Sequence, residues 1–313
     1  MTVDKPAGSQ GRDATDPITV LVTGATGFVG KRLVPELTGQ GMTVRAMTRR
    51  PREYDGPGEP VHGDVHDPGS LARAFEGVDV AVYLVHSLDD DDFERKDAEA
   101  ARAFGKAAAS AGVRQIVYLG GLGSEDQDLS AHLRSRREVE GLLGEAGVPV
   151  TVLRAAIVVG HGGISWEITR QLVKNLPAMV VPKWAATRSQ PIGIDDVVRY
   201  LAGVIDHPDA IGRVFEIGGS DVVSYVDMLQ QAAEVINGNR VIIVTVPVLS
   251  PQLSARWIGF VTDVDATTGR NLIDSMSTEV IVHDHSIREV VPGEPVSYQE
   301  AVRRAIEEER ASA

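Results

Sequence analysis

The chain has 313 residues and no cysteine, and its 44 acidic against 31 basic side chains leave a formal charge of -13. The absence of cysteine excludes a disulfide scaffold, a thiolate-bound metal site and a cysteine nucleophile. The acidic balance argues against a nucleic-acid or anionic-lipid partner, since both select a basic face. With 43% hydrophobic residues the chain can bury a large core, and its length suits one large domain with a smaller second lobe.

No segment predicts export or membrane insertion. Residues 1–17 are polar, lack the apolar core of a signal peptide and predict a disordered tail. The most apolar later run, Val241–Leu249, is far shorter than the roughly 20 residues that a bilayer helix needs, so it predicts a buried strand. We therefore expect a cytoplasmic protein.

From residue 18 to 160 the sequence repeats one order: an aliphatic run, a polar turn and a helical stretch closed by glycine. The runs are continuous rather than alternating, which is typical of parallel strands covered on both faces. The predicted strands are Ile18–Thr23, Thr43–Met47, Pro60–His62, Val78–Val85, Gln115–Leu119 and Val150–Val159. The predicted helices lie near Phe28–Thr38, Ser70–Phe75, Asp92–Ala111 and Ser130–Ala146. This alternation predicts an α/β fold with a doubly wound parallel sheet.

The second half is less regular and predicts a smaller α/β lobe over residues 161–313. Its predicted elements are a helix over Ile164–Asn175, a helix from Asp195 to Ile205, a strand over Val214–Ile217, and helices opened by capping boxes at Ser224 with Asp227 and at Ser297 with Glu300. Residues 195–217 could instead return to the main sheet.

The sharpest motif is the turn after the first predicted strand. Its glycines, Gly24, Gly27 and Gly30, are spaced GxxGxxG and open the first helix. The first permits a tight turn, the second lets the backbone approach a pyrophosphate, and the third allows close helix–strand packing. The free N–H groups of the helix start suit phosphates. The predicted dinucleotide contacts of this turn are Gly24, Thr26, Gly27, Phe28, Val29 and Gly30; a glycine turn without a ligand is the alternative.

The end of the second strand favours NADP(H) over NAD(H). An NAD site usually has an acid about 20 residues after the glycine turn. Here that neighbourhood is Thr48-Arg49-Arg50, and two guanidinium groups suit a 2′-phosphate. In the alternative interpretation, Arg49 and Arg50 are solvated loop residues.

The ends of the third and fourth strands supply further candidates. Asp64 follows Gly63 and could accept a hydrogen bond from the adenine amino group, while Val65 packs on the ring. Val85, His86 and Ser87 end the next strand, at the edge where such sheets bind ligands, and could face the ribose or the nicotinamide. For His86 a capping or loop role is the alternative.

These segments, in this order, resemble the short-chain dehydrogenase/reductase superfamily. More narrowly, the chain is similar to its atypical branch, which is related to NmrA-like regulators and to sugar-epimerase-like NAD(P)-binding proteins. The matching pieces are TGATGFVG at 23–30, Gly63-Asp64, YLVHS at 83–87, QIVYLGG at 115–121, HLRSRREVE at 132–140, VTVLRAAIVVG at 150–160, QPIGIDDVVRYL at 190–201 and GRVFEIGG at 212–219. The resemblance implies a Rossmann domain with an NAD(P) site over residues 18–160, followed by the substrate lobe.

The superfamily's chemistry, as the resemblance supplies it, uses a Tyr-x-x-x-Lys pair on one helix face and a Ser at the end of the fifth strand. This chain has His132 and Arg136 at the first two positions and Gly120-Gly121 at the third, with Ser124 as the nearest hydroxyl. His132 could act as an acid or base near neutral pH, whereas Arg136 could hold a ribose or phosphate but stays protonated. His132 and Arg136 are thus the catalytic candidates and Gly120 a cofactor contact; alternatively, the two are ordinary exposed helix residues.

Other side chains carry weaker signals. The pairs His62 and His66, and His283 and His285, lack further ligands, so we expect no metal. Trp184 either packs between the lobes or lines the substrate cleft.

Two classes of function follow. The first is an NADP(H)-dependent oxidoreductase or epimerase-like enzyme acting on a small carbonyl or hydroxyl compound, whose identity the sequence does not indicate. The second is a non-catalytic NAD(P)-binding sensor, regulator or redox-complex accessory factor that acts through a protein partner. The departures from the Tyr, Lys and Ser pattern favour the second, and the family as a whole favours the first.

Overall fold

A seven-stranded parallel sheet, with strands from residue 19 to residue 217, is the main sheet of the molecule. Its last strand in the chain, Val214–Ile217, lies within the range 195–217 for which the sequence left a return to this sheet open. The computed structural model describes residues 17–87, 92–123, 129–246, 276 and 278–312, so almost all of the predicted tail and Ser124 lie outside the described residues. The strand order is β11-β6-β5-β4-β1-β2-β3, and every pairing is parallel. The strands are β1 (Thr19–Thr23), β2 (Thr43–Thr48), β3 (Glu59–His62), β4 (Val80–Tyr83), β5 (Gln115–Gly121), β6 (Val150–Ala155) and β11 (Val214–Ile217).

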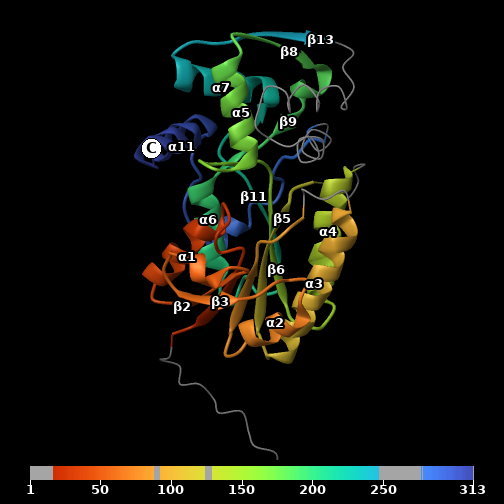
Figure 1. Cartoon of the computed structure of the whole chain (residues 1–313). Coiled ribbons are helices and arrows are strands. Elements are labelled where there is room, and N and C mark those ends of the chain that lie inside the picture. The colour runs from red at the N-terminus through yellow and green to blue at the C-terminus, as the bar shows by residue number, and fades with distance from the viewer. Residues whose placement is uncertain (1–16, 88–91, 124–128, 247–275, 277, 313) are drawn as a thin grey trace, which may run out of the picture.

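Helices cover both faces of this sheet (Figure 1). On one face lie α1 (Gly30–Gly39) and α6 (Ile194–Val204), and on the other lie α2 (Pro68–Ala74), α3 (Phe93–Ser110) and α4 (Ala131–Gly144). Strand side chains alternate between the two cores, as in β1, where Val20 and Val22 join one cluster and Leu21 joins the other. All three are fully buried, which explains why the strands read as continuous aliphatic runs. The predicted doubly wound α/β fold is confirmed.

One predicted strand is wrong in its extent. The run Val150–Val159 divides into β6 and a separate β7 (Val158–Val159), which pairs with β10 (Ile192–Gly193) outside the main sheet. The chain leaves the sheet at Ala156 and Ile157, where it borders the cavity described below. A continuous aliphatic run cannot reveal such a change of partner, because both strands bury the same residue types.

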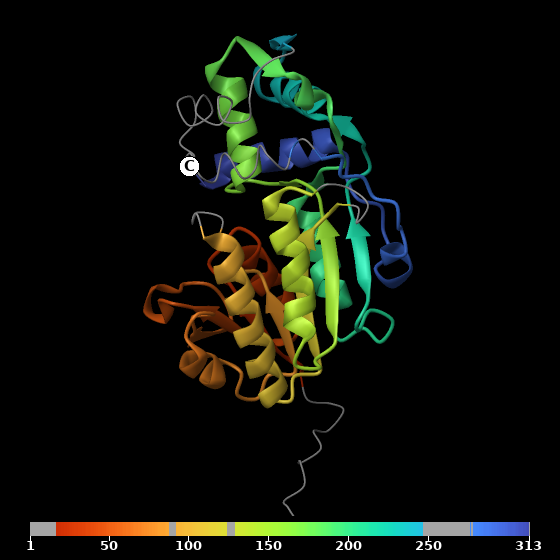
Figure 2. The same cartoon turned by 90° about the vertical axis from the view of Figure 1, so that its right-hand side faces the viewer.

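The second lobe stands on the carboxyl edge of the sheet, as the view of Figure 2 makes plain. Its helices are α5 (Ile164–Asn175), α7 (Tyr225–Asn237) and α11 (Tyr298–Ser312), and its short 3₁₀ turn is η2 (Lys183–Ala186). Another 3₁₀ turn, η1 (Pro51–Glu53), follows β2, and the short helix α10 (Ile287–Val290) packs against α6 and β11 in the core of the main sheet. Its strands are β8 (Ala178–Pro182) with β13 (Ile242–Val246), and β9 (Arg188–Ser189) with β12 (Val223–Ser224). A separate core, centred on the buried Trp166, packs these elements together.

The strand predicted near Val241 forms, but the prediction that it is buried is wrong. Strand β13 forms, but Ile242 is 66% and Val244 is 52% exposed. Its sheet has only β8 as a second strand among the described residues, so one face stays open. In the described part of the chain, no helix is both long and apolar enough to cross a bilayer.

Candidate functional site

A cavity of about 1080 Å³ lies where the carboxyl ends of the strands meet the second lobe. The candidate residues come from the loops after β1, β2, β3 and β4, from the start of α1, from the end of β5 and from helix α4, and all of them line this cavity. They are Gly24, Thr26, Gly27, Phe28, Val29, Gly30, Arg49, Arg50, Asp64, Val65, Val85, His86, Ser87, Gly120, His132 and Arg136. A volume of this size is at the upper end of the range for small-molecule sites, enough for more than one small ligand.

The glycine turn has the shape that its spacing predicts. Gly24 adopts φ +61°, a conformation that side chains with a Cβ avoid. A Cβ on Gly30 would lie 2.2 Å from the carbonyl oxygen of Gly24, so only glycine lets α1 start this close to β1. Among the described residues, no side chain caps α1, and its first turn holds no acid. The positive end of this helix is therefore open to an anion.

Thr23 connects the two central strand ends beneath the turn. Its fully buried hydroxyl donates to the Val82 carbonyl at 3.1 Å and accepts from the Leu84 N–H at 2.8 Å. Strand β4 thus ends at Tyr83, short of the predicted Val85, because Leu84 bonds to a side chain rather than to a neighbouring strand. This bond sets the course of the loop that carries Val85, His86 and Ser87 into the cavity.

At the end of β2, an acid stands beside the predicted arginine pair. Arg49 and Arg50 are both exposed and border the cavity, as does Glu53. Arg50 Nη1 lies 3.3 Å from Glu53 Oε2, in an ion pair whose side chains are 76% and 68% exposed. Such an exposed pair is worth little and can open when a stronger anion arrives. Glu53 was missed because it lies beyond the expected position, in η1.

The turn after β3 is fixed by its own hydrogen bonds. Asp64 Oδ1 accepts from the His66 N–H, and Ser70 Oγ accepts from the Asp64 N–H, both at 2.9 Å. The Asp64 side chain is therefore held at the rim of the cavity, with Val65 buried behind it.

His86 and Ser87 lie in the loop after β4, and helix α3 holds this loop in the wall of the cavity. The Ser87 N–H donates to Asp97 Oδ1 at 2.9 Å, and this carboxylate on α3 is buried. Burial raises the pKa of Asp97, and its hydrogen bonds with Ser87 oppose that shift. The His86 side chain opens on the cavity, yet the protein surrounds its ring closely enough that desolvation, with the charge of Arg136, lowers its pKa well below the ordinary value.

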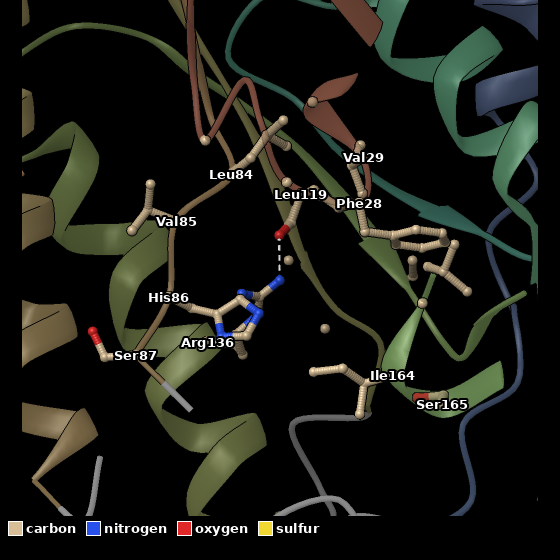
Figure 3. A pocket seen from close by; sticks show the side chains of 18 of the residues that line it. Phe28, Val29, Leu84, Val85, His86, Ser87, Leu119, Arg136, Ile164 and Ser165 are labelled. Carbon is tan, nitrogen blue, oxygen red and sulfur yellow. Dashed lines mark hydrogen bonds between the residues drawn. The ribbon is translucent and has the colours of Figure 1, made fainter. Parts of the chain in front are cut away.

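His132 and Arg136 project from α4 toward His86. The His86 and His132 rings meet edge to face, 6.4 Å apart. Arg136 Nη2 donates to the Leu119 carbonyl at 2.6 Å, and its guanidinium lies 5.4 Å from the Tyr118 ring centre (Figure 3). Burial and the Arg136 charge lower the pKa of His132 to about 3. The imidazole is thus neutral near pH 7, which corrects the expectation that it titrates there: it can donate one hydrogen bond, but it holds no spare proton.

The strand end that carries a Ser in the superfamily's pattern has no room for a side chain here. A Cβ on Gly121 would lie 2.8 Å from Leu133 Cδ2, and one on Gly120 would lie 3.0 Å from Glu140 Oε1. Leu133 therefore occupies the space beside Gly121, whereas at Gly120 the Glu140 carboxylate and the Tyr118 ring are the neighbours that a Cβ would crowd.

Sequence reasoning missed the wall that the second lobe contributes. The added lining residues at this end are Leu122, Leu133, Ala156, Ile157, Val158, Gly162, Gly163, Ile164, Ser165, Tyr225, Met276 and Val280. Trp184 does not line the cavity and instead packs edge to face on Tyr225, at 6.2 Å. Within the described residues, no cluster of three or more His, Asp or Glu could hold a metal ion.

Comparison with known proteins defines the family. The family described as NAD(P)H-binding matches residues 24–181. The (4-alkanoyl-5-oxo-2,5-dihydrofuran-3-yl)methyl phosphate reductase of Streptomyces griseus is 31% identical over 69% of this chain and 73% of its own length. A mitochondrial NADH dehydrogenase 1 alpha subcomplex subunit 9 of Arabidopsis thaliana is 25% identical over 69% of this chain, which spans only 57% of that relative. The structure of Citrobacter sp. triphenylmethane reductase complexed with NADP(H) has a TM-score of 0.75 at 19% identity and covers 92% of this chain and 100% of its own.

The chain belongs to the NAD(P)H-binding family of Rossmann proteins, as the resemblance predicted. The reductases among its relatives and structural neighbours support an oxidoreductase- or epimerase-like enzyme.

Proposed function

We propose that this chain is an NADP(H)-dependent oxidoreductase that transfers hydride to or from a small carbonyl or hydroxyl compound. The observation that carries the proposal is the single cavity, which begins at the open N-terminus of α1 and ends against the second lobe. The residues fit a dinucleotide, because the Gly24–Gly30 turn brings the uncapped start of α1 against β1 at the edge of the cavity. A Cβ at Gly30 would prevent this close approach. An assignment to the cytoplasm stays a prediction.

The preference for NADP(H) rests on Arg49 and Arg50. A 2′-phosphate would attract both guanidinium groups and take Arg50 from Glu53, because a doubly charged phosphate is the stronger partner. With NAD(H), Glu53 could instead accept from the ribose hydroxyl groups. The comparison of the two cofactors is therefore a direct test: titration with NADPH and NADH should give the tighter dissociation constant for NADPH, and equal affinities would refute the preference.

The roles of the remaining residues follow from their charge states. The cofactor supplies the hydride when it is bound. Arg136, fixed by Leu119, is the cation that would hold the ribose, and His132 would donate its N–H to the substrate oxygen. Since His132 is neutral, the proton that completes a carbonyl reduction comes from solvent rather than from the imidazole.

Turnover decides between the two functional classes. NADPH oxidation should be followed at the nicotinamide absorbance band with aldehydes, ketones and quinones as acceptors. Oxidation that depends on the acceptor, and that weakens in His132→Phe without a change in NADPH affinity, would support the reaction and the role of His132. Unchanged turnover in that variant would remove His132 from the mechanism.

A second candidate function is an NAD(P)-binding accessory factor of a redox complex. The filled strand end at Gly121 favours it, together with the 25% identity to an NADH dehydrogenase subunit. Tight NADPH binding without oxidation by any acceptor would support this alternative and would call for a search for a protein partner.

A further inference from the structure

The end of the cavity nearest the second lobe differs in character from the rest. We call it the substrate half, formed by Leu122, His132, Leu133, Ile157, Ile164, Ser165, Tyr225, Met276 and Val280. The rest of the cavity, which includes the Gly24–Gly30 turn, Arg49, Arg50, Asp64, His86 and Arg136, is called the cofactor half. Phe28 of this half lies against the start of α5, since a Cβ on Gly163 would lie 2.8 Å from its ring. The two halves are thus adjoining compartments of one cavity.

Among the described residues, the polar side chains that line the substrate half carry no charge near neutral pH. They belong to His132, Ser165 and Tyr225. Burial and Arg136 keep the His132 imidazole neutral by lowering its pKa, and burial raises the pKa of the Tyr225 phenol, which therefore stays protonated. The other side chains of this half are apolar, so a charged ligand would lose hydration there and gain little in return.

Helix α5, which starts at the substrate half, offers no anion site. Helix α5 begins at Ile164, and its first-turn acid Glu167 folds back so that Oε1 accepts from the Gly162 N–H at 3.3 Å. The Glu167 side chain is 20% exposed, and its carboxylate already offsets the positive helix end. Glu167 Oε2 also pairs with Arg170 Nη2 at 2.6 Å, and Glu167 is not among the described residues that line the cavity, so it opposes an anionic ligand only by occupying the helix start.

Helix α7 repeats the arrangement. It begins at Tyr225, behind a capping box in which the Asp227 carboxylate accepts from the N–H and hydroxyl of Ser224 at 3.2 and 2.6 Å. Two of the three helices that begin at the substrate half, α5 and α7, therefore carry an anion in their first turn. The third, α4, has no acid there, and the Ser130 hydroxyl caps it by accepting from the Leu133 N–H at 3.3 Å.

From this we infer that the substrate is an uncharged, largely apolar carbonyl compound, whose oxygen meets His132 and whose body lies between Ile164, Tyr225 and Val280. The inference rests on the proposed oxidoreductase function, which it makes more specific. It also separates this chain from its Streptomyces griseus relative, whose name specifies a phosphate ester. The opposing possibility is a carboxylate or phosphate that reaches Arg136 across the boundary with the cofactor half.

The test uses ligands that cannot react, so that binding and turnover are measured separately. The full-length protein, saturated with NADPH, is titrated by calorimetry with para-butylbenzyl alcohol and with para-carboxybenzyl alcohol, which share a ring and a hydroxymethyl group. We expect the neutral alcohol to bind at least about tenfold more tightly. Equal or tighter binding of the carboxylate, or no binding of the neutral alcohol up to its solubility limit, would overturn the inference.

A charge introduced at the half-exposed Ile164 provides the converse test. Ile164→Lys should raise the affinity for the carboxylate about tenfold, whereas the neutral control Ile164→Met should not change it. An unchanged affinity in the lysine variant would show that ligands do not reach Ile164, and so would also contradict the inference.

Turnover of the matching aldehydes tests the proposed function independently. If para-carboxybenzaldehyde oxidises NADPH faster than para-butylbenzaldehyde, the oxidoreductase function stands and the inference fails. If the neutral alcohol binds more tightly but neither these aldehydes nor any other acceptor oxidises NADPH, the proposed function fails, while the preference of the cavity for neutral ligands remains.

Discussion

The cofactor half and the substrate half of the cavity are both bordered by the start of a helix, yet they suit opposite charges. Helix α1 begins without a capping side chain and without an acid in its first turn, next to Arg49 and Arg50. Helix α5 begins with Glu167 folded over its N-terminus. The macrodipole is common to both helices, so the difference is made by a few side chains.

A helix N-terminus at the edge of the sheet therefore does not by itself predict an anion-binding site. In α1 the glycines bring the backbone close and keep the N–H groups available. In α5 the Glu167 carboxylate accepts a hydrogen bond from the Gly162 N–H and offsets the positive end of the helix. If the proposals hold, one fold combines a compartment for the cofactor's phosphates with one for a neutral substrate.

The largest effect should come from closing the cofactor half. In Gly30→Ala the new Cβ would meet backbone atoms of Gly24 and Ala25, at 2.2 and 2.8 Å, so that α1 must shift away from β1. We expect NADPH affinity, measured by calorimetry, to fall about 100-fold. Gly39→Ala in the same helix is the control, because a Cβ there has no neighbour within 4 Å. Equal affinities of the two variants would show that the turn does not hold the cofactor.

Removing the arginines should have a smaller and more selective effect. Replacing Arg49 and Arg50 together by Ala should weaken NADPH binding about tenfold, because exposed charge-assisted bonds to the 2′-phosphate are lost. NADH binding should change little. Arg52→Ala, in the 3₁₀ turn η1 that directly follows the pair and outside the cavity lining, serves as the control. A parallel loss of NADH affinity in the double variant would argue against a 2′-phosphate contact.

A neutral His132 has a consequence for stability as a function of pH. Its pKa is about 3 in the folded chain and about 6.5 when unfolded, so the unfolded state binds more protons between these values. The free energy of unfolding should therefore fall as the pH drops below about 6.5. Urea titrations at about pH 7 and pH 5.5 should show a loss that is smaller by about 1 kcal/mol in His132→Asn than in the wild type. The exposed His62→Asn is the control, and identical losses in all three proteins would contradict a buried neutral imidazole.

The cofactor half could be predicted because its signals are local. The glycine spacing, the arginine pair and the strand ends each lie within a few residues of a predicted element, and parallel strands bring their carboxyl ends to one edge. The sheet was predicted for the same reason, since continuous aliphatic runs identify buried parallel strands.

The substrate half could not be predicted, because only the tertiary fold assembles it. Ile164, Tyr225 and Val280 are far apart in the sequence, and no spacing relates them. The pKa of His132 also depends on burial and on the Arg136 charge, neither of which its helical position reveals. Residue type and spacing predicted that His132 titrates near neutral pH, but burial and the Arg136 charge lower its pKa far below that range.

The smallest effect is expected from a change at the start of α5, where Glu167 occupies the first turn. Glu167→Gln removes the negative charge from the first turn of α5 but keeps the shape of the side chain, so the positive helix end would become available. A favourable helix-end interaction is worth about 0.3–1 kcal/mol, so the affinity for para-carboxybenzyl alcohol should rise about twofold to fivefold. Affinity for the neutral para-butylbenzyl alcohol should stay the same. Glu94→Gln makes the same change in the first turn of α3, outside the cavity lining, and should alter neither affinity. A variant at Glu167 that binds both alcohols as the wild type does would mean that apolar walls alone, and not the occupied helix start, keep anions out of the substrate half.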